Sequence, residues 1–220
     1  MIIELFGPYA TGKTTLANEA ISNGMGELAS KVKFQTGKEA ISSDHPFFKK
    51  AIDLLLGENF VKRYFYLVND SYMSASQKLA CTNMFYASAK RYSLCMQCPE
   101  KTILEDEGLL LRGLDSTACS YDTANALKEY FSYVPLPNVV VFCSSGVEKE
   151  KERIMKRGFG INPFYSIPDE SVLDEVERIN ERFRVAKKVL SNRKGARFLS
   201  MDLNVDGVDA FSRKLRELIG

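Results

Sequence analysis

Short apolar runs alternate with amphipathic stretches along the whole chain. Runs such as Ile2–Phe6 and Val139–Cys143 are apolar almost throughout, which is typical of short strands buried inside a sheet. The stretches between the runs carry apolar residues three or four positions apart, as one face of a helix requires. This alternation predicts an α/β fold in which parallel strands are joined by right-handed crossovers and covered by helices on both faces.

The pattern also predicts where the elements lie. Strands are expected at 2–6, 32–35, 101–106, 139–143 and 197–201. Helices are expected at 14–22, 46–56, 121–133, 147–157, 169–191 and 208–219, with one or two more inside 60–98. Because no linker rich in Pro or Gly divides the chain, residues 1–220 are predicted to form a single domain.

Charge and cysteine content narrow the class of protein. The net charge of +2 is too balanced to indicate a nucleic acid or an anionic membrane surface as partner. No stretch is apolar for long enough to span a membrane, and the first residues lack the pattern of a secretory signal. We therefore expect a cytoplasmic protein, in which the odd number of cysteines, 5, are reduced thiols.

Two of these cysteines, Cys95 and Cys98, form a C-x-x-C pair. A zinc site would need two further ligands at similar spacing, and the sequence near the pair has none. We interpret the pair as structural or incidental thiols, with a redox role as the alternative.

The strongest chemical signal is Gly7-x-x-x-x-Gly12-Lys13-Thr14, which follows a predicted strand and precedes a predicted helix. This is the Walker A pattern, in which glycines let backbone N–H groups converge on phosphates and the helix N-terminus adds positive potential. The lysine then reaches the β- and γ-phosphates, and the hydroxyl of Thr14 is placed to hold Mg²⁺. The residues predicted to bind ATP here are Gly7, Tyr9, Ala10, Thr11, Gly12, Lys13, Thr14 and Thr15.

A second candidate element is the acidic run Glu105-Asp106-Glu107-Gly108, at the end of a predicted strand. In an open parallel sheet, ligands bind beyond the carboxyl ends of the strands, so a carboxylate here would lie beside the phosphates. We favour Asp106 as the metal-side or base residue, followed by Glu105. The sequence does not separate the roles of the three acids.

A third candidate element is the charged helix after Val139–Cys143. Arg153 and Arg157 are four positions apart and share one helix face. Two guanidinium groups on a segment that closes over the site could stabilise charge on a phosphoryl group in transfer. The alternative is a surface helix held by ion pairs between its alternating Glu and Lys residues.

With these motifs in place, the chain resembles the nucleoside and nucleotide kinases of the P-loop class, and the thymidylate kinase-like members most. The resemblance implies about five parallel strands, MgATP as cofactor, and an arginine-bearing lid at about 148–168. It places Lys13 and Thr14 on the phosphates and Mg²⁺, Asp106 at the acidic position, and Arg153 and Arg157 in the lid. It also implies that the loop around Asn204 touches adenine, and that a homodimer could form through helices.

The chain departs from this family where it has Glu-Asp-Glu-Gly in place of Asp-Arg or Glu-Arg. The missing arginine normally helps to hold the acceptor, and Arg112 is a weak candidate to replace it. In this architecture acceptors bind after the second and third strands, where Lys38 and Glu39 lie, and Glu39 is another candidate base. Arg63 and Arg91 either bind an acceptor phosphate or are solvated. The aromatic residues of 60–98 are interpreted mainly as core, with base stacking as the alternative.

The predicted function is therefore an ATP-dependent phosphotransferase acting on a small-molecule acceptor, most readily a nucleoside or nucleotide. Two alternatives stay open. One is a kinase of a sugar or another metabolite hydroxyl, and the other is a nucleotide-dependent switch or regulatory NTPase.

Overall fold

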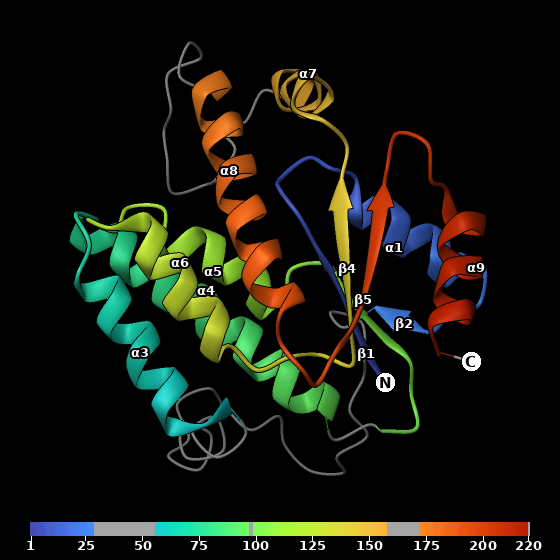
Figure 1. The fold of residues 1–220 in the computed structure, drawn as a ribbon, viewed down its shortest axis with the longest axis horizontal. Coiled ribbons are helices and arrows are strands. Elements are labelled where there is room, and N and C mark those ends of the chain that lie inside the picture. Colours follow the sequence, from blue (N-terminus) through green and yellow to red (C-terminus); the bar gives the residue numbers. More distant parts are fainter. Residues whose placement is uncertain (29–55, 97–98, 158–171, 220) are drawn as a thin grey trace.

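The computed structural model describes residues 1–28, 56–96, 99–157 and 172–219. Within them lies a parallel sheet in the order β2-β3-β1-β4-β5 (Figure 1). This confirms the predicted α/β arrangement of parallel strands. The strands are β1 Ile2–Phe6, β2 Glu27–Leu28, β3 Ile103–Glu105, β4 Val139–Ser144 and β5 Arg197–Asp202.

Helices lie on both sides of this sheet, as predicted (Figure 1). In Figure 1, α1 and α9 cover one face, α3 to α6 and α8 cover the other, and α7 lies over the carboxyl ends of the central strands. The helices are α1 Lys13–Ser22, α3 Glu58–Asn69, α4 Ala75–Met96, α5 Leu109–Ser116, α6 Thr123–Tyr133, α7 Val147–Arg157, α8 Val172–Ser191 and α9 Val208–Ile219.

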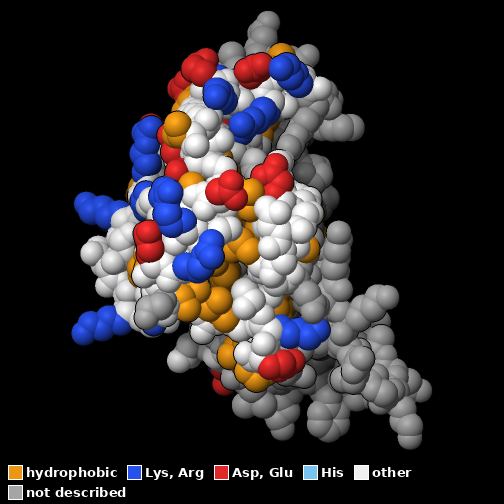
Figure 2. Space-filling model, turned by 90° about the vertical axis from the view of Figure 1, so that its right-hand side faces the viewer, with side chains coloured by type: hydrophobic (Ala, Val, Ile, Leu, Met, Phe, Trp, Pro, Cys, Tyr) orange, Lys and Arg blue, Asp and Glu red, His pale blue; other side chains and the backbone are white. Residues whose placement is uncertain are grey.

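The position of β1 between two covered faces of the sheet explains why its sequence is apolar almost throughout. Ile3 and Leu5 point into the core shared with α1 and α9, whereas Ile2 and Phe6 point into the core shared with α3 to α6 and α8. Because successive side chains of a strand alternate between faces and both faces are covered, both sets must be apolar. The outer side of α1 and α9 is mixed in character, with hydrophobic side chains between interspersed acidic and basic ones (Figure 2).

Two elements differ from the sequence expectation. The second strand was expected at 32–35, which lies outside the described residues, and the strand β2 that pairs with β3 lies earlier, at Glu27–Leu28. Helix α5 was not expected at all. It has 8 residues and an internal glycine, Gly113, where an added Cβ would lie 2.5 Å from the ring of Tyr130. The glycine therefore serves close helix packing, although it weakens the helical pattern.

Two further helical regions were predicted, at 60–98 and at 46–56. The block 60–98 forms the two helices α3 and α4, as one of the predicted options had it. The predicted helix 46–56 lies outside the described residues except for its last residue. Among the described residues, no helix combines the length and the apolar character that crossing a membrane requires.

Candidate phosphate-binding site

The loop between β1 and α1 has the geometry of a phosphate cradle. Gly7 lies so close to β4 that an added Cβ would be 2.1 Å from the carbonyl oxygen of Cys143. Gly12 has a φ of +105°, a conformation that favours glycine, and Ala10 has a φ of 60°. Both glycines of the motif are therefore required by the backbone path, and α1 begins directly at Lys13 with its N-terminus at the loop.

Lys13 is buried under this loop. Its Nζ donates hydrogen bonds to the carbonyl oxygens of Gly7 at 2.9 Å and of Pro8 at 2.5 Å. Burial lowers the pKa of the Lys13 ammonium below its usual value. The ammonium is thus held at the centre of the loop and satisfied by carbonyl oxygens, which an incoming phosphate would have to replace.

Thr14 and Asp106 meet at the edge of the loop. Because β1 and β3 are neighbours in the sheet, their carboxyl ends lie side by side. The Oγ1 of Thr14 donates to the Oδ2 of Asp106 at 2.6 Å. The described residues contain no group of three or more His, Cys, Asp or Glu side chains that could hold a metal by themselves. One hydroxyl and one carboxylate suit Mg²⁺, which usually binds through one or two protein groups and the phosphates of a nucleotide.

The three acids after β3 have different surroundings. Glu105 is buried and accepts from Nε of Arg91 at 3.2 Å. Burial raises its pKa, while the charge of Arg91 lowers it. Glu107 is exposed, and its Oε2 lies 4.0 Å from Nη2 of Arg112. Asp106 is the acid of this run that contacts the P-loop hydroxyl.

Arg153 reaches the same loop from α7. Its Nη1 donates to the carbonyl oxygens of Ala10 at 2.9 Å and of Thr11 at 2.8 Å. The side chain of Arg157, at the end of α7, lies outside the described part of the chain, as do residues 158–168 of the expected lid. The lid itself therefore stays a prediction.

The loop after β5 lies beside Gly12. A Cβ added at Gly12 would be 3.7 Å from Cδ1 of Leu203. The Nδ2 of Asn204 donates to the carbonyl oxygen of Ser145 at 2.6 Å, which fixes this loop to the end of β4. Asn204 is exposed next to the phosphate cradle, where an adenine contact was predicted, and that contact stays a prediction.

A buried network behind the P-loop was missed by the sequence analysis. The hydroxyl of Tyr9 donates to Asp115 of α5, and Nη1 of Arg112 donates to the other oxygen of the same carboxylate at 3.0 Å. Burial and the charge of Asp115 raise the pKa of Tyr9 well above its usual range. The signal available in the sequence was an acid and a base three positions apart, in a leucine-rich stretch that had not been recognised as a helix. Arg112 is therefore engaged with Asp115 and Glu107 and does not stand free for an acceptor.

Glu4 is a second buried group that the sequence analysis did not single out. It lies in β1 in register with Glu105 and accepts from the backbone N–H of Leu110 at 2.8 Å. Burial, followed by the charge of Glu105, raises the pKa of Glu4 to about 8. Its Oε2 is buried with no hydrogen-bond partner among the described residues, which fits a protonated carboxyl in this position.

The acceptor-side predictions divide into three groups. Arg63 pairs with Glu129 at 2.6 Å, and Arg91 pairs with Glu105 at 3.2 Å. Neither arginine is therefore a free surface cation. Tyr64 and Phe85 stack on each other inside the core at 3.8 Å between ring centres, as the core interpretation predicted. Lys38, Glu39 and Cys98 lie outside the described residues.

Comparison with known proteins gives a fold. Neither a family model nor a curated protein matches the sequence. Among solved structures, deoxyadenosine kinase from M. mycoides with the products dCMP and a flexible dCDP is similar, with a TM-score of 0.54 and 18% identity over 99% of this chain and 100% of that one. The same kinase with bound dATP gives a TM-score of 0.51 and 18% identity over 98% and 100%.

The chain has the fold of this P-loop kinase. An identity of 18% shows the fold and leaves the activity to be argued from the site. The thymidylate kinase-like subgroup stays a prediction.

Proposed function

We propose that the protein is an ATP-dependent kinase that transfers the γ-phosphoryl group of ATP to a hydroxyl of a small molecule. The main observation in support is the contact between Thr14 and Asp106, at 2.6 Å, beside the complete Walker A loop. It brings a hydroxyl and a carboxylate to one point at the N-terminus of α1, where Mg²⁺ and the phosphates of a nucleotide are bound in this class of site.

The residues of the site have separate roles in this reaction. Lys13 and the loop N–H groups bind the β- and γ-phosphates, and Thr14 and Asp106 would hold Mg²⁺, which would offset phosphate charge when bound. The acceptor oxygen forms a bond to the γ-phosphorus as the bond from that phosphorus to the β–γ bridging oxygen breaks. The residue that orients the acceptor hydroxyl and takes its proton is Asp106, if it does not hold the metal, or else Glu105. Arg153, with Arg157, stabilises the negative charge that moves with the phosphoryl group.

A nucleoside or nucleotide acceptor is the favoured class. The M. mycoides structures with this fold hold dCMP, dCDP or dATP, and their fold likeness supports the same class here without identifying the acceptor. A sugar or another metabolite hydroxyl is the alternative acceptor. A regulatory NTPase would instead hydrolyse ATP with no acceptor. A cytoplasmic location and a homodimer also remain predictions.

The test is ADP release from MgATP by the purified chain against deoxynucleosides, nucleoside monophosphates and common sugars. Release that depends on one acceptor class, and that is lost in Lys13→Ala but kept in Lys188→Ala, would support the kinase. Lys188 is an exposed lysine of α8 and serves as the matched control. Hydrolysis that needs no acceptor but still needs Lys13 would favour the regulatory NTPase and contradict the proposal.

A further inference from the structure

Glu150 is a fully buried carboxylate in the first turn of α7. Its Oε2 accepts a hydrogen bond from Nδ2 of Asn180 on α8 at 2.6 Å. Its Oε1 accepts from the hydroxyl of Ser145 at 3.2 Å, and Ser145 directly follows β4. One carboxylate therefore joins three parts of the chain, which are α7, α8 and the carboxyl end of a central strand.

The surroundings of Glu150 favour its ionised form against the effect of burial. Burial raises the pKa of this carboxyl, whereas the hydrogen bonds from Asn180 and Ser145 and the positive charge of Lys13 lower it. An apolar side chain of similar volume often stabilises a fold as well as a buried, paired charge does. Stability alone therefore gives no reason for a carboxylate at this position.

The residue one turn further along α7 is Arg153. Side chains three and four positions apart are neighbours on a helix surface, so Arg153 and Ile154 lie on the same side of α7 as Glu150. Ile154 packs against Ala10 of the P-loop and Val176 of α8. This side of α7 therefore faces the phosphate cradle, and the direction of the helix determines where the guanidinium of Arg153 lies.

The guanidinium of Arg153 lies beside the start of α1. Its Nη1 donates to the carbonyl oxygens of Ala10 and Thr11, and it would be 3.7 Å from a Cβ added at Gly12. The phosphates of a nucleotide bind at this end of α1 in a Walker A site. A small rotation of α7 would therefore move the guanidinium away from the phosphates.

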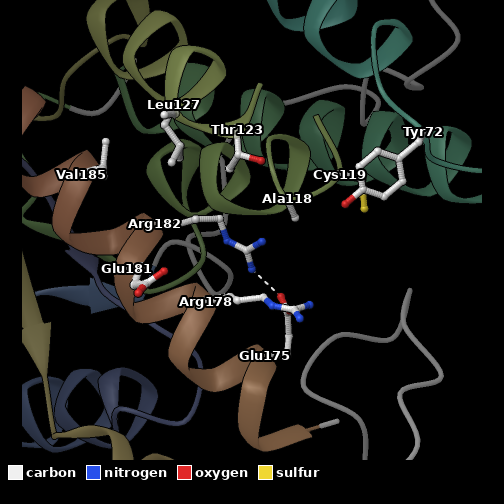
Figure 3. A pocket seen from close by; sticks show the side chains of 11 residues that line it. Tyr72, Ala118, Cys119, Thr123, Leu127, Glu175, Arg178, Glu181, Arg182 and Val185 are labelled. Atoms are coloured by element: carbon white, nitrogen blue, oxygen red, sulfur yellow. Dashed lines mark hydrogen bonds and ion pairs between the residues drawn. The ribbon is translucent and has the colours of Figure 1, made fainter. Parts of the chain in front are cut away.

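Asn180 holds Glu150 from the face of α8 that meets α7. Its Nδ2 also donates to the carbonyl oxygen of Val176 at 2.9 Å, which fixes the amide in its own helix. Glu175 and Arg182 lie on the opposite face of α8, where they line a cavity between α6 and α8 (Figure 3). Changes on that face alter α8 without touching the contact between Asn180 and Glu150.

Ser145 holds Glu150 from the side of the sheet. Besides the bond from its hydroxyl, its carbonyl oxygen accepts from Nδ2 of Asn204 at 2.6 Å. The backbone N–H of Glu150 donates to the carbonyl oxygen of Gly146 at 3.2 Å. The first turn of α7 is therefore fixed both to α8 and to the loop after β5.

We propose that Glu150 is a positioning residue that holds α7 in the direction in which Arg153 meets the γ-phosphate of a bound nucleotide. The inference rests on the proposed function, which assigns Arg153 to the transferred phosphoryl group, and it adds the residue that keeps Arg153 in place. Glu150 itself touches neither nucleotide nor acceptor, because its side chain is 0% exposed.

The test measures how strongly the chain prefers a triphosphate to a diphosphate. The full chain, with Mg²⁺ present, is titrated calorimetrically with the β,γ-methylene analogue of ATP and with ADP. The ratio of the two affinities reports the contact between Arg153 and the γ-phosphate, which ADP lacks. We expect Arg153→Ala to lower this ratio about tenfold, as loss of a hydrogen bond between charged groups does, and Glu150→Leu to lower it at least about fivefold. Glu150→Gln keeps an oxygen acceptor for Asn180 and should lose less than Glu150→Leu.

Two control variants separate positioning from stability. Glu177→Leu makes the same substitution in an exposed pair between the same two helices, since Glu177 lies 2.9 Å from Lys151 of α7. Glu175→Gln removes the charge that pairs with Arg182 on the other face of α8. Both should leave the ratio unchanged, and Glu175→Gln should lower stability to urea. A Glu150→Leu chain that loses stability but keeps the ratio would overturn the inference.

A double variant shows whether Glu150 acts through Arg153. In Glu150→Leu combined with Arg153→Ala, the ratio should be no lower than in Arg153→Ala alone. A further loss would mean that Glu150 acts by another route and would contradict the inference. If Glu150→Leu does not fold, Asn180→Ala removes the 2.6 Å donor from the other side and should also lower the ratio. An unchanged ratio in folded Asn180→Ala would contradict the inference as well.

ADP release with the acceptor panel, measured on the same preparations, tests the kinase proposal separately. A chain whose ratio depends on Glu150 but which phosphorylates no acceptor would contradict the kinase proposal and still support this inference. A chain that phosphorylates an acceptor equally well before and after Glu150→Leu, with an unchanged ratio, would support the kinase and overturn this inference.

Discussion

Tyr9 of the P-loop donates its hydroxyl hydrogen to Asp115, a buried carboxylate on α5. This bond joins the phosphate cradle to the C-terminal end of α5. Because Arg112 holds the second oxygen of Asp115, the carboxylate is fixed from two sides. The position of the loop is therefore set partly by α5, a helix outside the Walker A motif.

We expect Tyr9→Phe to weaken ATP binding several-fold with little loss of stability, because the loop loses its anchor while the ring still packs. Asp115→Asn should instead lower the free energy of unfolding by about 3–5 kcal/mol, since the buried Arg112 loses the carboxylate 3.0 Å away and keeps only that of Glu107, at 4.0 Å. Urea unfolding and ATP titration measure the two effects. Tyr121→Phe is the control, because Tyr121 is 75% exposed. Equal effects of Tyr9→Phe and Tyr121→Phe on ATP binding would argue against the anchor.

The hydroxyl of Thr14 is expected to be needed for Mg²⁺. Thr14→Ala should lower kcat/KM by about 100-fold, a loss comparable to removal of one transition-state contact. It should also raise the Mg²⁺ concentration that gives half-maximal rate. Thr14→Ser keeps the hydroxyl and should retain most of the activity. If Ser and Ala at this position behave alike, the hydroxyl has no role with the metal.

Arg153 is expected to act in phosphoryl transfer and not only in packing. Arg153→Ala should reduce kcat more than it raises KM for ATP, because its charge matters most when negative charge moves between phosphates. Lys156→Ala, at an exposed position of the same helix, is the control. A loss confined to thermal stability, with kcat unchanged, would show that Arg153 only holds the carbonyl oxygens of Ala10 and Thr11.

Glu4 should make stability depend on pH. Its pKa is raised in the folded protein to about 8, so the buried carboxyl favours the protonated form. The stabilisation is fully present below its unfolded pKa and is lost as pH rises through the folded value. Between the unfolded pKa and the folded pKa of Glu4, the free energy of unfolding should fall by about 1.4 kcal/mol per pH unit. Glu4→Gln should remove this slope, whereas Glu58→Gln, on the exposed side of α3, should keep it.

Urea titrations at about pH 6 and about pH 9 measure this difference, because that interval crosses the folded pKa. Equal slopes for the unmodified chain and for Glu4→Gln would mean that Glu4 is ionised in the folded state.

The elements that could be predicted from the sequence are those whose signal lies in contiguous residues. The Walker A loop, β1 and β4 are written in contiguous residues, and the structure places them as expected. The strand β2 has only two residues and no apolar run, so periodicity could not find it. Helix α5 was missed because Gly113 interrupts a short leucine-rich stretch, and the packing against Tyr130 that favours glycine there comes from a distant part of the chain.

The candidate site shows the same limit. A carboxylate beside the phosphates could be expected from the sequence, because the Walker A loop and Asp106 each follow a strand of the predicted parallel sheet. The partners of Tyr9 and Arg91 could not, since Asp115 and Glu105 reach them through tertiary packing that no spacing rule encodes. The sequence favoured Asp106 among the three acids without separating their roles, and the structure gives the three acids different contacts.

The P-loop carbonyl oxygens are already occupied by cations of the protein itself. Lys13 takes those of Gly7 and Pro8, and Arg153 takes those of Ala10 and Thr11. The Lys13 ammonium and the Arg153 guanidinium already donate hydrogen bonds to these backbone oxygens. An anion that binds here must therefore compete with the oxygens for the same N–H groups. The affinity for a phosphate chain is therefore a difference between two sets of strong hydrogen bonds, and a weakly basic anion that cannot match the lost set gains little by entering.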